Sequence, residues 1–354
     1  MSTKPELQPR PGASPVLDLP RPYLLFLGDT TERGYAKTAF GLRDWAGELC
    51  VGEWSCEGAT VSAGLARLTP KEARARGARA LVIGVANTGG VIGESWIPSL
   101  VEALESGLDI ISGMHAKLGG VPQLKAAAER HGRRLIDVRT PPKNIPIASG
   151  AKRSGKRLLT VGTDCAIGKK YTALALARAF TQRGLAADFR ATGQTGILIA
   201  GGGMPMDAVV ADFEAGAAEI LSPDAAPEHW DVIEGQGSLF HPAYAGVALG
   251  LLHGSQPDVV VVCHEFGRNE MLGHPGYALP ELAETIEMNV RLGRRTNPAI
   301  RCAGISLNTS GLAEREASTL LEAQSAQLDL PVADPMRAGA AFERLVDNCL
   351  AIHR

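Results

Sequence analysis

One short segment constrains the fold of this chain more than any other: a glycine-rich loop between a strand-like run and a helix-like segment. The loop extends from Gly162 to Lys169, after the apolar run Arg157–Val161 and before Lys169–Arg183, where alanine and leucine recur at helical spacing. Glycines let a backbone fold around an anion, and the N–H groups at a helix N-terminus attract phosphate. The segment therefore predicts a phosphate-binding turn in an α/β protein.

The loop departs from the regular phosphate-binding motif in two ways. Five residues rather than four separate Gly162 from Gly168, and Lys170 stands where a magnesium-binding hydroxyl is usual. We expect the Lys169 ammonium to be the clearest anion contact, and Lys170 argues against an ordinary magnesium site for ATP hydrolysis. The alternative is a turn without a ligand. The expected cofactor-binding residues of the loop are Gly162, Thr163, Gly168, Lys169 and Lys170.

Further apolar runs of strand length recur along the chain, separated by segments long enough for helices. They are Tyr23–Gly28, Ala80–Ala86, Leu108–Ser112, Ala186–Arg190, Val232–Ile233, Val259–Cys263 and Ala303–Leu307. This alternation predicts parallel sheets, and 354 residues favour two domains at about 150 residues each. We therefore expect an α/β fold with two doubly wound parallel-sheet domains.

Prolines suggest where these domains begin and end. The first 22 residues contain six prolines, so residues 1–22 are expected to form an extended arm, either a loose tail or an arm that packs on a neighbouring subunit. Pro141, Pro142 and Pro146 mark a linker. The expected divisions are the arm 1–22, a Rossmann-like domain 23–140, a linker 141–156 and a loop-containing domain 157–354.

Composition excludes several classes of protein. With 45 % hydrophobic and 21 % charged residues and a net charge of −2, the chain is globular and has no general attraction for nucleic acid. No apolar run approaches the roughly 20 residues that span a bilayer, and the N-terminus lacks a signal core, so we expect a cytoplasmic protein without membrane contact. The six cysteines show no zinc spacing, and nine residues between His264 and His274 match no ligand motif, so no metal is expected. We also expect a homo-oligomer.

The loop resembles that of dethiobiotin synthetase and its P-loop relatives, which also begins Gly-Thr-Asp and has the five-residue interval. Two further segments, Ala191–Gly196 and Asp231–Gly237, resemble theirs, and Gly304–Asn308 is similar to their base-binding strand. The resemblance implies a P-loop NTPase-like fold for the second domain and a cofactor contact for Asn308. It also implies one alternative function, an ATP-dependent ligase or kinase that uses ATP and magnesium.

From about Tyr23 onward the chain resembles a more particular family, the proteins that carry domain of unknown function 1611. The matching segments are Gly28–Asp29, Asn87–Gly90, Ser112–His115, the loop, Glu234–Leu239 and His241–Pro242. The resemblance implies an N-acetyltransferase that uses acetyl-coenzyme A and acts on the small molecule D-glutamate or another D-amino acid. A nucleotide-binding regulatory protein without turnover is a third class to consider.

Acyl transfer to an amine needs a base and donors that face the developing oxyanion. Glu234 follows a strand and precedes Gly235, so it can approach a ligand as the base; its alternative role is to brace a loop. Asp164, inside the loop, is a second candidate for contact with the amine, or else caps the helix. His241 and His264, both near strand ends, complete the catalytic candidates, although each can equally be a hydrogen-bonded loop residue.

Guanidinium groups bind carboxylates in a bidentate manner, so Arg190 and Arg268 are candidates for holding a substrate carboxylate. Gln194, within Ala191–Gly196, is a third substrate-binding candidate. In the first domain, Gly28–Gly34 and Asn87–Gly90 both follow strand-like runs, but neither is the GxGxxG fingerprint. Nicotinamide binding is therefore not expected.

Overall fold

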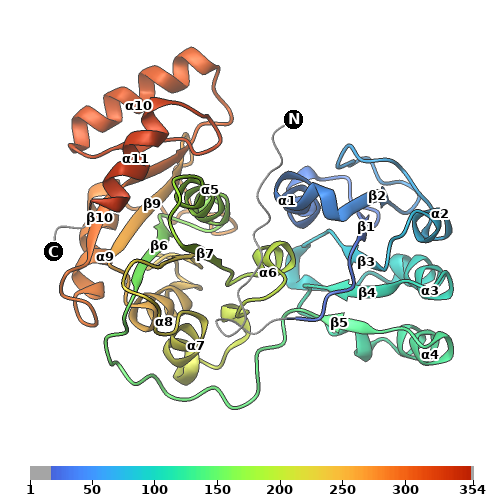
Figure 1. The fold of residues 1–354 in the computed structure, drawn as a ribbon. Helices are drawn as coiled ribbons and strands as arrows, with labels where there is room; N and C mark the ends of the chain where they lie inside the picture. Colours follow the sequence, from blue (N-terminus) through green and yellow to red (C-terminus); the bar gives the residue numbers. More distant parts are fainter. Residues whose placement is uncertain (1–16, 352–354) are drawn as a thin grey trace. The chain divides into compact units, whose positions relative to one another are not determined.

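The computed structural model describes residues 17–351 and divides them into two compact units (Figure 1). The N-terminal unit contains residues 17–140 together with Ile197–Pro205, and the C-terminal unit contains Pro141–Gly196 and residues 206–351. Most of the expected arm lies outside the described residues. At its end, the Leu17 N–H donates to the Gly201 carbonyl at 3.0 Å, within the N-terminal unit.

The C-terminal unit contains the glycine-rich loop and is built on a six-stranded sheet with the order β11-β10-β9-β6-β8-β7. All of its pairings are parallel. Its strands are β6 (Lys156–Gly162), β7 (Ala187–Arg190), β8 (Trp230–Ile233), β9 (Val259–Glu265), β10 (Arg301–Asn308) and β11 (Val332–Ala333). Its helices are α5 (Lys169–Gln182), α6 (Gln194–Ala200, which continues into the N-terminal unit), α7 (Glu214–Leu221), α8 (Ala245–Ser255), α9 (Leu282–Gly293), α10 (Glu314–Leu328) and α11 (Ala340–Leu350).

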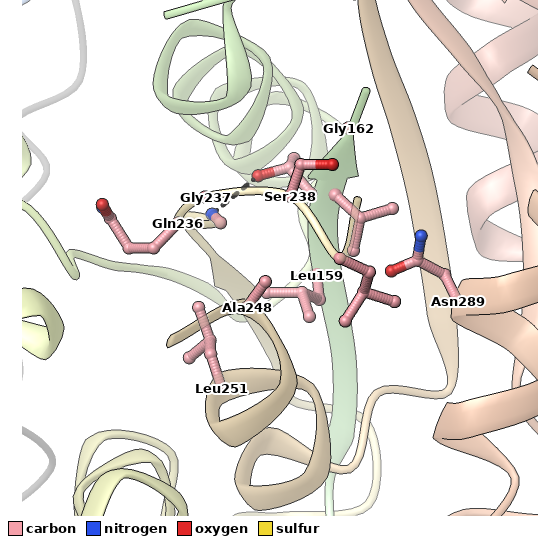
Figure 2. Close-up of a pocket in the computed structure, with 12 residues that line it drawn as sticks. Leu159, Gly162, Gln236, Gly237, Ser238, Ala248, Leu251 and Asn289 are labelled. Carbon is pink, nitrogen blue, oxygen red and sulfur yellow. Dashed lines mark hydrogen bonds between the residues drawn. The ribbon is translucent and has the colours of Figure 1, made fainter. Parts of the chain in front are cut away.

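The β6 strand lies inside this sheet, and six of its seven residues are buried, as is usual for a parallel strand covered by helices. Helix α5 packs against β6, β7 and β8, and α8 packs against β6. Between β6 and α8 is a cavity of about 10 Å³, lined among others by Leu159, Ala248 and Leu251 (Figure 2). This space holds about one water molecule, so it is too small for a cofactor.

The N-terminal unit is built on a five-stranded sheet with the order β2-β1-β3-β4-β5, again with parallel pairings. Its strands are β1 (Tyr23–Phe26), β2 (Cys50–Trp54), β3 (Ala80–Ile83), β4 (Asp109–Ser112) and β5 (Leu135–Asp137). The connecting helices are α1 (Lys37–Ala46), α2 (Pro70–Ala75), α3 (Ile97–Glu105) and α4 (Pro122–His131). Prolines in the first turns of α2, α3 and α4 fit because the N–H that proline lacks has no helical partner there.

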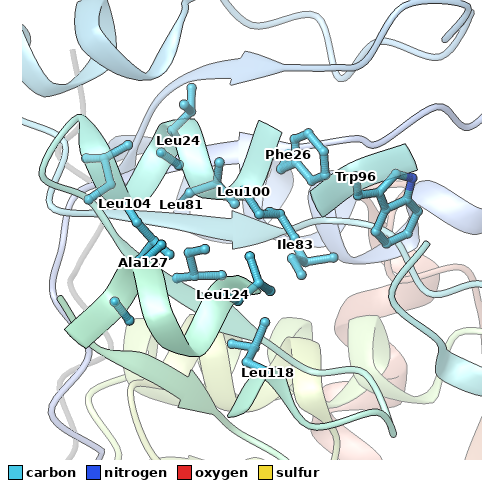
Figure 3. Packing of buried hydrophobic residues seen from close by; sticks show 14 of the residues in the cluster. Leu24, Phe26, Leu81, Ile83, Trp96, Leu100, Leu104, Leu118, Leu124 and Ala127 are labelled. Carbon is cyan, nitrogen blue, oxygen red and sulfur yellow. The ribbon is translucent and has the colours of Figure 1, made fainter. Parts of the chain in front are cut away.

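Apolar side chains of β1, β3, α3 and α4 form the core of this unit (Figure 3). Phe26 packs edge-to-face against Trp96, with ring centroids 5.9 Å apart. Leu81 and Leu100 have no exposed surface. The alternation of apolar runs and helices thus produces the two-sheet α/β fold that the sequence predicts.

Each of the seven apolar runs named above and the run Arg157–Val161 coincides with all or part of a strand of the structure. Three strands were not expected: β2, β5 and β11. In the part of the chain between residues 17 and 351, no helix is both long and apolar enough to cross a bilayer.

Candidate functional site

The loop after β6 begins and ends at glycines that the local geometry requires. A Cβ on Gly162 would lie 2.5 Å from Cδ1 of Ile167 and 2.8 Å from the Cys263 carbonyl oxygen, so only glycine lets the loop turn against β9. Gly168, directly before α5, has a φ of +111°, which side chains disfavour. The loop therefore places its backbone at the N-terminus of α5.

Lys169 is turned into this loop. Its side chain is buried, and Nζ donates to the Asp164 carbonyl oxygen at 2.6 Å. Burial lowers the pKa of Lys169, while the charges of neighbouring groups, among them Asp164 and Glu234, oppose that change. An anion in the loop would give this ammonium a charged partner in place of a carbonyl.

Asp164 joins the loop to the segment that follows β9. Its carboxylate is fully buried: Oδ1 accepts from the Cys165 N–H at 2.6 Å, and Oδ2 accepts from the Leu272 N–H at 2.8 Å and from Arg268 Nη1 at 3.1 Å. The same Arg268 nitrogen donates to the Cys165 carbonyl oxygen at 2.8 Å. Residues 266–280 are thus attached to the loop through two contacts on one carboxylate.

Both expected histidines lie against the loop. The Oγ1 of Thr163 is hydrogen-bonded to Nδ1 of His264 at 2.9 Å. His241 is buried, and its Nε2 lies 3.8 Å from Asp164 Oδ1. The structure therefore brings Asp164, His241 and His264 together around the loop, as their positions after strands suggest.

Glu234 follows β8 and is 4 % exposed. Its Oε2 accepts from the Thr192 N–H at 2.9 Å and from the Gly193 N–H at 3.1 Å. Burial raises the pKa of Glu234, whereas the Lys170 charge and those two hydrogen bonds lower it, and burial prevails. The carboxylate is thus fixed in direction and shifted toward the protonated form.

Glycines surround Glu234 because backbone and side chains approach each other closely there. A Cβ on Gly196 would lie 2.2 Å from Glu234 Oε2, and one on Gly235 would lie 1.7 Å from the Thr160 carbonyl oxygen. The Gly235 N–H also donates to Thr160 Oγ1 at 2.9 Å, which ties the Glu234 segment to β6. The glycines of both sequence segments are therefore needed for this packing.

The remaining candidates lie at the same carboxyl edge of the sheet but differ in their partners. Arg190, at the end of β7, is 4 % exposed and donates to Asp231 Oδ1 at 2.7 Å, with Asp188 Oδ2 3.3 Å away. Its guanidinium is therefore bonded to protein carboxylates. The guanidinium of Arg268 is also paired, with Asp164 and Glu265, but it lies at the loop and its side chain is more exposed. Asn308 ends β10, and its amide donates to Glu265 Oε1 at 3.5 Å; Gln194 begins α6 and is buried.

Sequence reasoning overlooked Cys165 and the backbone N–H groups of Thr192 and Gly193. Ligand atoms of Asp164, Cys165 and His241 lie within 4.8 Å of one another, an arrangement that can be typical of a metal centre. The His241 Nδ1, however, accepts from the Ala243 N–H at 3.1 Å, so the ring proton is on Nε2 and no lone pair faces the other two groups. Within this group of three residues, His241 Nε2 is therefore a hydrogen-bond donor rather than a metal ligand.

Two family models cover most of the chain. The Rossmann-like domain model of domain of unknown function 1611 (DUF1611_N) matches residues 50–141, and its P-loop domain model (DUF1611_C) matches residues 146–346. The chain belongs to the DUF1611 family. The resemblance seen in the sequence is thereby confirmed, and so is a Rossmann-like fold followed by a P-loop fold.

Among curated relatives, a D-glutamate N-acetyltransferase of Pseudoalteromonas sp is 49 % identical over 318 residues, which cover 90 % of this chain and 96 % of that protein. A D-glutamate N-acetyltransferase of Tritonibacter scottomollicae is 51 % identical over 331 residues, which cover 94 % and 99 %. The crystal structure of a DUF1611 family protein from Anabaena variabilis matches with a TM-score of 0.83 and 32 % identity, over 93 % of this chain and 99 % of that one.

Proposed function

We propose that this DUF1611 protein is a D-glutamate N-acetyltransferase that transfers the acetyl group of acetyl-coenzyme A to the amino group of D-glutamate. The observation that carries the proposal is the identity of about half of all residues to two proteins of that name, over nine-tenths or more of each chain. The reaction requires an acyl-coenzyme A donor site, a base and an amine site.

The donor site of the proposal is the loop after β6. Coenzyme A carries phosphates, and the N–H groups of the loop, the N-terminus of α5 and the Lys169 ammonium all attract anions. Asn308 is the proposed contact for the base of coenzyme A. Thr163 and Lys170 are the proposed contacts for its phosphates. On binding, Lys169 would exchange its bond to the Asp164 carbonyl for a charged one.

Glu234 is the proposed base. Two backbone N–H groups fix its Oε2, and a carboxylate with a raised pKa accepts a proton more readily near neutral pH than an ordinary one. As the amine nitrogen forms a bond to the acetyl carbon, the nitrogen loses a proton to Glu234. The carbon–sulfur bond then breaks and the departing thiolate takes up that proton, which completes the exchange.

The proposed acceptor site lies near Arg268 and Gln194. D-Glutamate carries two carboxylates, and Arg268, part-exposed beside the loop, supplies a guanidinium of the kind that binds them. Gln194, two residues before Gly196 in the segment that holds Glu234, would place its amide beside the base. The Arg190 side chain is bonded to Asp231 and is 5 % exposed, against 18 % for Arg268, so Arg190 is not part of this proposal.

A thiol-release assay tests the proposed function. Purified protein with acetyl-coenzyme A should release free coenzyme A only when D-glutamate or a closely similar D-amino acid is added, and L-glutamate is the matched control. An absence of thiol release across both D- and L-amino acids would contradict the proposal. Magnesium-dependent ADP formation from ATP would instead indicate the ligase or kinase class that the loop also resembles.

A further inference from the structure

The tautomer of His241 is fixed by the backbone. Its Nδ1 accepts a hydrogen bond from the Ala243 N–H at 3.1 Å. A ring nitrogen that faces a donor must carry a lone pair, so the proton of the neutral ring is on Nε2. His241 therefore presents an N–H donor, and its lone pair is already used.

That donor is buried and has no partner. Nε2 makes no hydrogen bond within the described part of the chain, and its side chain has no exposed surface. Oδ1 of Asp164 is 3.8 Å from Nε2, beyond hydrogen-bond range. Buried polar groups almost always have partners, so an unpaired buried donor beside a ligand-binding loop indicates that a ligand atom completes it.

The surroundings keep the ring neutral. His274, from residues 266–280, packs edge-on at 4.7 Å between ring centroids, and the Tyr244 ring lies 4.5 Å away at an interplanar angle of 31°. Burial lowers the pKa of His241, the charges of His274 and Lys169 lower it further, and Asp164 opposes them. Protonation would also set an Nδ1–H against the Ala243 N–H, so the ring stays an uncharged donor at neutral pH.

We propose that the His241 Nε2–H binds the thioester carbonyl oxygen of the donor and stabilises the oxyanion that forms there. The role rests on the proposed function, and it assigns His241 as an electrophilic catalytic residue rather than a base. As the amine nitrogen bonds to the acetyl carbon, the carbonyl π pair moves onto oxygen, which accepts from Nε2. When the carbon–sulfur bond breaks, that pair returns and the sulfur takes the proton held by the base.

The partner of Nε2 is a carbonyl oxygen rather than a phosphate oxygen because of Asp164. A phosphate carries its full charge at all times and would be repelled by a carboxylate that lies 3.8 Å from Nε2. A thioester oxygen is neutral until attack, and Arg268 and the Leu272 N–H already compensate Asp164. A neutral imidazole donor that polarises a carbonyl is a known device in enzymes.

Two variants of His241 distinguish the effect of its N–H donor from the effect of the shape of its ring. His241→Leu removes the donor and should lower kcat by about 100- to 1000-fold, as loss of one oxyanion donor does. His241→Gln places an amide N–H near the position of Nε2 and should recover at least about tenfold of that loss. Coenzyme A affinity, measured by calorimetry, should change less than about twofold in both variants. Thermal unfolding is the control that checks whether both variants are folded.

A near-normal kcat for His241→Leu overturns the role, as does a loss of coenzyme A affinity with kcat unchanged, which would indicate a phosphate contact. Nitrogen NMR of histidine-labelled protein tests the tautomer without activity: the signals absent from His241→Gln should show protonated Nε2 and bare Nδ1. A protonated Nδ1 would also overturn the proposed role of His241. If the wild type transfers no acetyl group, the proposed function fails, whereas transfer with an unaffected Leu variant removes only the role of His241.

Discussion

Burial acts in opposite directions on the two charged side chains at the centre of the site. It lowers the pKa of Lys169 and raises that of Glu234, because a low-dielectric environment disfavours either charge. Each group is therefore closer to its neutral form than an exposed one would be. At Glu234 this makes a better proton acceptor, and at Lys169 it leaves a cation with few partners and a strong tendency to bind an anion.

The substitution Glu234→Gln keeps the shape of the side chain but removes the proton acceptor. We expect kcat to fall by about 100- to 10000-fold with coenzyme A affinity little changed. Steady-state kinetics and calorimetry measure the two quantities. Near-normal turnover would exclude Glu234 as the base and make Asp164 and His264 the next candidates.

As the proposed base, Glu234 should also determine the acid side of the pH profile. The base must be deprotonated, so kcat falls as pH drops through the pKa of Glu234, and burial places this decline above the usual value of 4.5. The profile of kcat against pH should therefore decline well above pH 4.5 in the wild type. The residual rate of Glu234→Gln should lack that decline; the same decline in the variant would assign it to another group.

Lys169→Ala removes the proposed charged contact to coenzyme A. A hydrogen bond of this kind contributes about 1.5 to 3 kcal/mol, which corresponds to a rise of about 10- to 150-fold in the dissociation constant of coenzyme A. Lys125→Ala, at an exposed position of α4, is the matched control and should leave that constant unchanged. If both variants bind coenzyme A with equal affinity, Lys169 does not contact the donor.

At the scale of elements, the interior strands of both sheets were predictable, whereas among the edge strands of residues 17–351 only β7 was. The strands β1, β3, β6 and β9 are buried over most of their length, so they read as apolar runs. The three unexpected strands are all sheet edges: β2 includes Glu53, β5 ends at Asp137 and is only partly buried, and β11 has two residues. Half-exposed or very short strands carry no apolar run to detect.

The same distinction applies to the site. Glu234, His264 and Asn308 could be predicted because each follows or ends a strand, and strand ends meet at one edge of a parallel sheet. The bond of Arg190 to Asp231 depends on the β7–β8 register, which sets Asp188 beside Asp231. The contact of Leu272 with Asp164 joins residues 108 positions apart, and no local pattern encodes it.

Helix α6 provides a test of how tightly Glu234 is held. In Gly196→Ala the new Cβ would lie 2.2 Å from Glu234 Oε2, so the carboxylate must move, and we expect about 1 to 3 kcal/mol less stability together with lower kcat. Gly246→Ala in α8 meets no atom within 4 Å and should be neutral or stabilising by up to about 1 kcal/mol. Urea unfolding compares the two. Equal stability of both variants would contradict the close packing around Glu234.

At the scale of the whole molecule, the proposed chemistry belongs to one of the two units. Lys169, Glu234, His241 and Arg268 all lie in the C-terminal unit. In the N-terminal unit, Asp29 follows β1 but accepts hydrogen bonds from Trp96 Nε1 at 2.8 Å and from Ser95 Oγ at 2.7 Å. That carboxylate ties the loop after β1 to the residues directly before α3.

The most direct test of the proposed activity follows a labelled acetyl group through a complete turnover. Purified full-length protein is incubated with acetyl-coenzyme A labelled with ¹³C in the acetyl group and with D-glutamate, and the products are measured by mass spectrometry. The account predicts labelled N-acetyl-D-glutamate in a one-to-one ratio with free coenzyme A, and none from L-glutamate under the same conditions. Coenzyme A release without labelled N-acetyl-D-glutamate, or no release at all, would contradict it.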